Sequence, residues 1–289
     1  MKYFITHFIL LLTLFLSNSC RAPDQSTLEK VRALQLNSID GDIVAYYTEG
    51  FKGRAESSLN LLGKSIGFFE DNFGAKQSFS VAVIDSVSWE KITPIPYGLP
   101  FVSGPPYIVC IPADSKNALS NAILTAINGY ELDSQYGMTN DEIVNLFVSL
   151  IGFHELGHIY ANAYGISFPN RWTYEFAATY FAYSYIDQGF QKERDIWIDV
   201  SEILVKEINP RYTSLNDFEE MYVSVGVENY AWYQVVFLLR VKELYKEQGI
   251  NFLNNLKNHQ WGSTSKYHYL NEMEEIGSGF KAWTQKFQL

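Results

Sequence analysis

Two histidines and a glutamate in the stretch FHELGHIY, residues 153–160, have the types and spacing of a metal site. His154 and His158 are four positions apart, so a helix places both imidazoles on one face. Two imidazoles at that spacing can hold one Zn²⁺ ion, which prefers four tetrahedral ligands. Glu155 follows the first histidine, where a carboxylate can take a proton from a water that the metal polarises. The stretch predicts a zinc site; the alternative is a buried helix stripe with two hydrogen-bonded histidines.

A catalytic zinc site needs a third protein ligand and an open fourth position. Glu175 is the candidate, because it lies seventeen residues after His158 on a second predicted helix that begins near Asn170. The short connection between the helices favours an antiparallel return, which brings Glu175 alongside the histidines. The helix face of Glu175 is otherwise small, with Ala178 and Ala182, and a carboxylate buried there needs a partner. The alternative is a glutamate that is exposed on its helix.

The two histidines depend on a helix that directs them toward the core. Thr139 and Glu142 have the spacing of a capping box, so this helix is predicted to begin near Thr139. Apolar residues follow at steps of three and four, and His154 and His158 continue the same stripe. Gly165 is predicted to end the helix.

Strand patterns precede this helix and helical patterns follow it. Strands are predicted at 42–48, 79–85 and 107–111, an early helix at 54–72, and later helices at 191–207, 229–248, 250–257 and 267–285. This order predicts an α+β fold. The folded domain would span 42–289, with a small sheet lobe at about 42–138 and a helical lobe at about 139–289.

Residues 1–19 have the pattern of a cleaved signal peptide. Lys2 gives a positive start, and the apolar run that follows is too short for a transmembrane anchor. The sequence LSNSC, which ends at Cys20, resembles the lipobox of bacterial lipoproteins. That resemblance implies a lipidated Cys20 and a place in the bacterial cell envelope; ordinary secretion is the alternative. The polar residues 20–41 are predicted to form a lipid-anchored tether.

The charge distribution excludes some partners. The formal net charge is −10, and basic residues do not cluster anywhere in the chain. Nucleic acid and anionic membrane surfaces are therefore not expected as partners, and membrane contact is expected through the lipid anchor only. Cys110 lies in the apolar run YIVCI and is predicted to be a buried thiol.

The stretch HELGH, followed on the next helix by WTYEFAATY, resembles the gluzincin metallopeptidases, which include thermolysin and the aminopeptidase N group. Trp172, Glu175 and Ala178 match the aminopeptidase pattern of Trp, two residues, Glu, two residues, Ala. Tyr174 stands where the family usually has Asn. The resemblance implies a thermolysin-like fold with the zinc site between its two lobes. It also implies that YIVCI is the edge strand near the cleft.

The resemblance assigns roles to individual residues. It implies one zinc ion per chain, held by His154, His158 and Glu175, with Glu155 as general base and acid. Gluzincins also use a Tyr or His to stabilise the oxyanion. The first candidate for this role is Tyr230, which could instead be a packing residue. The other candidates are Tyr233, His259 and His268. Thr179, one turn after Glu175, is a candidate to orient a ligand.

Together these inferences predict an exported zinc metallopeptidase acting on peptide or protein substrates. Two other functions stay open: a catalytically inactive binding lipoprotein on the same scaffold, and a zinc hydrolase of glycopeptides. The intact Glu155 favours a hydrolase over a binding protein, because a structural zinc site needs no base.

Overall fold

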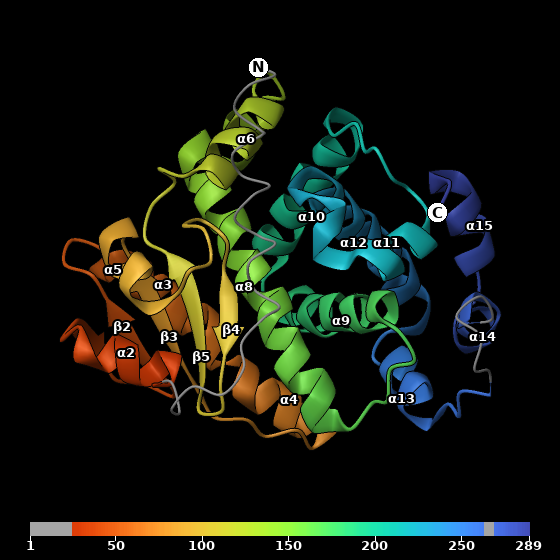
Figure 1. Ribbon diagram of the computed structural model, residues 1–289, viewed down its shortest axis with the longest axis horizontal. Coiled ribbons are helices and arrows are strands. Elements are labelled where there is room, and N and C mark those ends of the chain that lie inside the picture. The colour runs from red at the N-terminus through yellow and green to blue at the C-terminus, as the bar shows by residue number, and fades with distance from the viewer. Residues whose placement is uncertain (1–24, 263–268) are drawn as a thin grey trace.

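A five-stranded mixed sheet forms one side of the molecule and helices form the rest of it, in a computed structural model that describes residues 25–262 and 269–289 (Figure 1). The strands are β1 Asn37–Ile39, β2 Val44–Tyr47, β3 Phe79–Ile84, β4 Phe101–Ser103 and β5 Tyr107–Pro112, in the spatial order β1-β2-β3-β5-β4. The three central strands are parallel, and β1 and β4 are antiparallel edges. The predicted α+β class is confirmed.

Helices cover both faces of this sheet. On one face Val81, Val83 and Val109 join the main core with α3 Lys52–Gly63 and α8 Asn140–Tyr164. On the other face Ala82 and Cys110 pack with α2 Thr27–Ala33 and α5 Ser86–Ile92. Strands buried on both faces read as continuous apolar runs, which is why β3 and β5 were predictable. The predicted burial of Cys110 is confirmed.

The folded chain begins earlier than the sequence predicted. Residues 27–33 and 37–39, expected to belong to the tether, form α2 and β1 instead. A capping box between Ser26 and Glu29 starts α2, and its Leu28 and Val31 are buried. The apolar area that these two side chains remove from water favours folding over a solvated tether. The signal peptide, Cys20 and the rest of the tether up to residue 24 lie outside the described residues.

The expectation that YIVCI forms the sheet edge was wrong. β4 pairs with the outer side of β5, with Val102 opposite Val109, and is itself the edge. β4 has only three residues and lies within a proline-rich loop, so it has no detectable alternation of apolar and polar residues.

The helical body contains most of the remaining chain. Its elements are α4 Ser65–Phe73, α6 Ala118–Ile127, α7 Leu132–Tyr136, α9 Arg171–Gly189, α10 Gln191–Glu207, α11 Leu215–Met221, the 3₁₀ helix η2 Tyr222–Val225, α12 Val227–Gln248, α13 Asn251–Asn258, α14 Tyr269–Ile276 and α15 Phe280–Phe287. Two predicted single helices are each broken in two. The first breaks at Lys64, where the Ser65 hydroxyl donates to the Leu62 carbonyl. The second breaks before Gly279, whose φ of 90° is favourable for glycine.

The long helix α8 crosses the centre of the molecule, and α9 packs across it (Figure 1). The predicted capping box at Thr139 and Glu142 is formed, and Gly165 ends α8 in a left-handed conformation. Asn170 caps α9 as predicted. Among the described residues, α8 alone has the length and apolar composition of a membrane span. Its apolar window is 72% buried inside the protein, as in the core helix of a folded domain.

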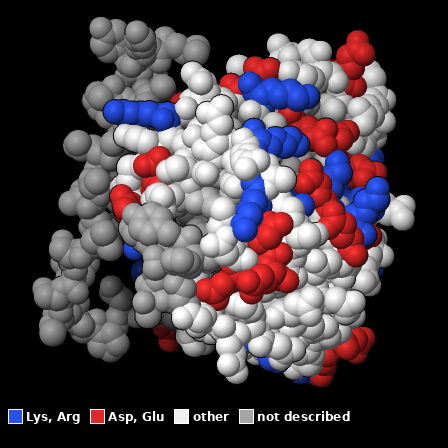
Figure 2. Space-filling view, turned by 90° about the vertical axis from the view of Figure 1, so that its right-hand side faces the viewer, with Lys and Arg blue, Asp and Glu red and all other residues white. Residues whose placement is uncertain are grey.

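The surface charges are mixed where the molecule can be viewed from the side of α15. Figure 2 shows Lys and Arg side chains interspersed with Asp and Glu over this face, without a continuous basic area.

Candidate metal centre

The two histidines and Glu175 converge at the crossing of α8 and α9. Nε2 of His154 lies 3.0 Å from Oε2 of Glu175, and Nε2 of His158 lies 3.6 Å from the same oxygen. One ligand atom from each of the three residues lies within 4.8 Å of the others. Zinc bonds of 2.0–2.1 Å place the corners of a tetrahedron about 3.3 Å apart. The two histidine–glutamate separations are close to that value.

A glycine between the histidines permits this convergence. A Cβ atom at Gly157 would lie 2.1 Å from the carbonyl oxygen of Ala178, so any side chain there would force the helices apart. Ala178 lies one turn after Glu175, on the small face that the sequence predicted for α9. Close contact of the two backbones therefore brings Glu175 within reach of both histidines.

Thr179 fixes the orientation and tautomer of His154. Its hydroxyl donates to the backbone carbonyl of Glu175 at 3.1 Å, so its oxygen can only accept from Nδ1 of His154, 2.9 Å away. This network assigns the proton of the neutral ring to Nδ1 and the lone pair to Nε2. That lone pair points at a carboxylate oxygen 3.0 Å away, so a proton or a metal ion must lie between the two atoms. The predicted orienting role of Thr179 agrees with this contact.

Replacing Thr179 with valine should weaken metal binding and leave the fold intact. Valine has nearly the same shape but leaves Nδ1 of His154 without an acceptor. Loss of such a contact to a ligand typically lowers metal affinity about 10- to 100-fold. Competition with a chelator measures the affinity. Thr284→Val removes another buried helix hydroxyl, which is remote in sequence and donates to the Lys281 carbonyl, and should leave the affinity unchanged. Equal affinities in the two variants would contradict the orienting role.

His158 is positioned by packing instead of by a second hydrogen bond. Its Nδ1 is buried and has no hydrogen-bond partner among the described residues. The ring packs on Tyr174, with centroids 4.3 Å apart and a 35° angle between the planes. The hydroxyl of Tyr174 accepts a hydrogen bond from Asn162 at 3.1 Å. Tyr174, the departure from the gluzincin pattern, therefore supports His158 by ring contact.

Glu175 accepts hydrogen bonds from three further side chains. Tyr222 donates to Oε1 at 2.5 Å, and Tyr230 and Gln234 donate to Oε2 at 3.1 and 2.9 Å. The residue is 1% exposed. Burial opposes its ionisation, but the two histidines outweigh that effect and hold the pKa of Glu175 well below its usual value. The pKa values of both tyrosines are raised by burial first and by the Glu175 charge second, so both hydroxyls remain donors.

Tyr222 and Gln234 were not predicted from the sequence. Tyr222 has φ 47° and ψ −120°, a conformation that costs a residue with a side chain about 1–3 kcal/mol. The guanidinium of Arg171 lies 5.0 Å from its ring, and the short bond to Glu175 holds its hydroxyl. No sequence periodicity marks this tyrosine, because the chain leaves α11 just before it. Gln234 lies one turn after Tyr230 on α12, and that spacing was the available signal.

Of the candidates for the oxyanion role that the structure describes, one lies at the metal centre. Tyr230 lies at the site, as predicted. Tyr233 points elsewhere and donates to the Ser214 carbonyl at 2.7 Å. His259 pairs with Glu272 at 2.8 Å, beyond the end of α13. His268 lies outside the described residues.

Glu155 is half-buried beside the ligand group. Burial raises the pKa of Glu155 to about 7. His154 and a hydrogen bond from the Val102 backbone oppose this rise, whereas the charge of Glu175 adds to it. Val102 lies on the edge strand β4, so this strand borders the site. A carboxyl group with a pKa near neutrality is suited to accept and donate a proton in turn.

The donor set defines a buried His-His-Glu group that can hold a metal ion. Two nitrogen ligands and one carboxylate match the ligand types of zinc sites that keep a position open for water or substrate. Comparisons of the chain with protein-family models, with curated proteins and with solved structures give no match.

Proposed function

We propose that this protein is an exported zinc metallopeptidase with a thermolysin-like, gluzincin fold. The observation that carries the proposal is the position of Glu155, a half-buried carboxyl group that follows His154 on α8, beside a group of two histidines and a glutamate that can hold a metal ion. A metal site that only stabilises the fold does not need a carboxyl group that accepts and donates protons. The resemblance of HELGH and WTYEFAATY to gluzincins supports the same conclusion.

The residues of the site have distinct tasks in this proposal. His154, His158 and Glu175 would hold the ion, and Thr179 keeps the lone pair of His154 Nε2 directed at it. A zinc ion there supplies Lewis-acid polarisation of a water molecule and of the peptide carbonyl. Glu155 accepts the proton of the attacking water and passes it to the leaving amine.

Tyrosine hydroxyls are the candidate donors to the oxyanion. Tyr230 and Tyr222 both remain protonated and both reach the carboxylate of Glu175. A donor directed at the developing charge typically contributes about 2.7–4 kcal/mol to the transition state. Tyr230 is the first choice because a regular helix positions it, whereas Tyr222 depends on a strained backbone.

A peptide is the preferred substrate class because an edge strand borders the site. β4 pairs with β5 on one side only, and its Val102 contacts Glu155. An extended peptide can add to such an edge through main-chain hydrogen bonds, which a glycan lacks.

Replacing Glu155 with glutamine should abolish turnover and preserve metal binding. Glutamine keeps the shape of the side chain but cannot carry the proton, and loss of a general base typically lowers the rate about 10²- to 10⁴-fold. Cleavage of a peptide library and zinc content are measured together on the zinc-loaded protein. Glu90→Gln changes an exposed glutamate on α5 and should leave both quantities unchanged. Unaltered turnover in Glu155→Gln, or no cleavage by the zinc-loaded wild type, would contradict the proposal.

We also propose that Cys20 is lipidated and tethers the protein to the bacterial envelope. The support is the sequence LSNSC after an apolar run with a positive start. Cys20→Ser should move the protein from the membrane fraction to the soluble fraction, because the anchor would be the only membrane contact. Cys110→Ser, at a buried position, is the matched control. Membrane retention of Cys20→Ser would indicate a different mode of attachment.

A further inference from the structure

A cavity lies among helices α7, α9, α10 and α12. Its volume is about 710 Å³, within the range of sites that hold drug-sized ligands. None of the metal-site residues lines it. Tyr183, which lines the cavity, is two turns beyond Glu175 along α9, or roughly 12 Å at the rise of an α-helix. The cavity is therefore separate from the metal centre.

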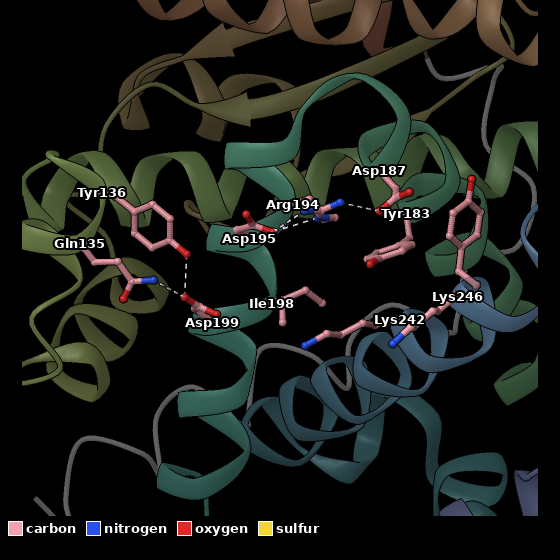
Figure 3. A pocket seen from close by; sticks show the side chains of 11 residues that line it. Gln135, Tyr136, Tyr183, Asp187, Arg194, Asp195, Ile198, Asp199, Lys242 and Lys246 are labelled. Atoms are coloured by element: carbon pink, nitrogen blue, oxygen red, sulfur yellow. Dashed lines mark hydrogen bonds and ion pairs between the residues drawn. The ribbon is translucent and has the colours of Figure 1, made fainter.

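Opposite charges face each other across this cavity. Asp195 and Asp199 are four residues apart and share one face of α10, and Lys242 and Lys246 do the same on α12. Figure 3 shows the aspartates and Arg194 along one side of the cavity and the two lysines along the opposite side. No ion pair within the described chain joins these aspartates to these lysines. The two charged faces are therefore held apart.

The acidic side keeps negative charge and free acceptor atoms. Arg194 is shared between Asp187 and Asp195, at 2.9 and 2.8 Å, so one cation faces two carboxylates. Asp199 accepts from Gln135 and Tyr136 through Oδ2 only. In the described residues its Oδ1 has no hydrogen-bond partner, which leaves it available to a donor from outside.

The basic side keeps positive charge and free donors. Lys246 has no ion-pair or hydrogen-bond partner in the described part of the chain. Lys242 pairs with Glu202 at 2.9 Å, outside the cavity lining, and retains further donors. The tyrosine ring of Tyr183 lies between the two sides (Figure 3).

We propose that this cavity binds a short peptide with free termini, with its amine against the α10 aspartates and its carboxylate against the α12 lysines. A simple anion would meet repulsion from the aspartates, and a simple cation would meet it from the lysines. A zwitterion satisfies both faces, and the tyrosine rings offer apolar contact to the residue between the termini. Binding here does not depend on the peptidase proposal, because no residue is shared between the two sites.

The test is calorimetric titration of the full chain with trialanine. The protein carries Glu155→Gln so that peptide is not consumed, and each titration is repeated with a metal chelator to separate this cavity from the metal centre. N-acetyl-trialanine and trialanine amide each remove one terminal charge, and each should bind about tenfold more weakly. Trehalose serves as the neutral polyhydroxyl probe.

Two variants assign the termini. Lys246→Ala should reduce the preference for trialanine over its amide, because only Lys242 is left to bind the carboxylate, and Asp199→Asn should reduce the preference for trialanine over its acetylated form, because only Asp195 is left to bind the amine. Lys91→Ala, an exposed lysine on α5, should retain the full discrimination. Absence of saturable trialanine binding at millimolar concentration, binding that the chelator abolishes, or tighter binding of trehalose would each overturn the proposal. If the metal centre proves to have no peptidase activity, the expected binding of trialanine to this cavity does not change, because the two sites share no residue.

Discussion

Replacing Glu175 with alanine is expected to weaken zinc binding by at least about 100-fold. Loss of a group that merely orients a ligand already costs about 10- to 100-fold, and Glu175 is proposed as a ligand itself. Its carboxylate is 1% exposed and lies 3.0 and 3.6 Å from the two histidine nitrogens. Alanine would leave two imidazoles alone, and two ligands do not complete a zinc site of this kind.

Thermal unfolding with and without zinc measures this effect. A ligand that binds only the folded state stabilises it by about 2.7 kcal/mol at a concentration of 100 times its Kd. Zinc should therefore raise the melting temperature of the wild type and not that of Glu175→Ala. Glu247→Ala, an exposed glutamate on α12, should behave as the wild type. An equal zinc-induced shift in Glu175→Ala would mean that this carboxylate is a hydrogen-bonded core group and not a ligand.

A second variant separates loss of the ligand from loss of the fold. Alanine leaves the hydroxyls of Tyr222 and Tyr230 and the amide of Gln234 without their acceptor, and each buried donor left unpaired costs about 1–3 kcal/mol. Glu175→Gln keeps a carbonyl oxygen in nearly the same place. It should therefore be more stable than Glu175→Ala without metal and still bind zinc more weakly than the wild type.

The sequence was sufficient for the helices that carry the histidines and Glu175. Their ends are set by local chemistry, a capping box at Thr139 and an Asn cap at position 170, and local chemistry is readable one residue at a time. The inward stripe of α8 follows from spacing alone, so the direction of His154 was predictable. The same logic was available for α2, whose Ser26–Glu29 capping box predicts a helix where a tether was expected.

The sequence was not sufficient for the groups that surround Glu175. Tyr222 reaches the site from a strained turn 47 residues away, and Val102 reaches Glu155 from a three-residue strand. Both positions depend on packing between segments far apart in the chain, and such packing produces no periodic pattern of apolar residues in the local sequence. In a chain with twenty tyrosines, residue type alone could not single out Tyr222. Helical spacing was informative only where a regular helix reaches the site, as for Tyr230 and Gln234.

Gly157→Ala is expected to destabilise the protein and to disrupt metal binding together. In an open helix position, alanine is more favourable than glycine by about 1 kcal/mol. At Gly157 the added Cβ would lie 2.1 Å from the Ala178 oxygen, so the backbones of α8 and α9 must move apart. Overpacking of this kind typically costs about 1–3 kcal/mol and occasionally more. The same movement carries Glu175 away from the histidines, because it lies within one turn of Ala178.

Two other glycines provide the controls for this variant. Gly67, inside α4, has no atom within 4 Å of the position that an added Cβ would take, so Gly67→Ala should stabilise the fold by about 1 kcal/mol. Gly152, on α8 itself, would meet only ordinary contacts at 3.5 Å with Ile111, so Gly152→Ala should also be tolerated and should not lower the free energy of unfolding. Urea denaturation measures the three free energies of unfolding, and chelator competition measures zinc affinity. If Gly157→Ala gained stability as Gly67→Ala does and kept its zinc, the helices would not need to touch, and the convergence of the three ligands would require another explanation.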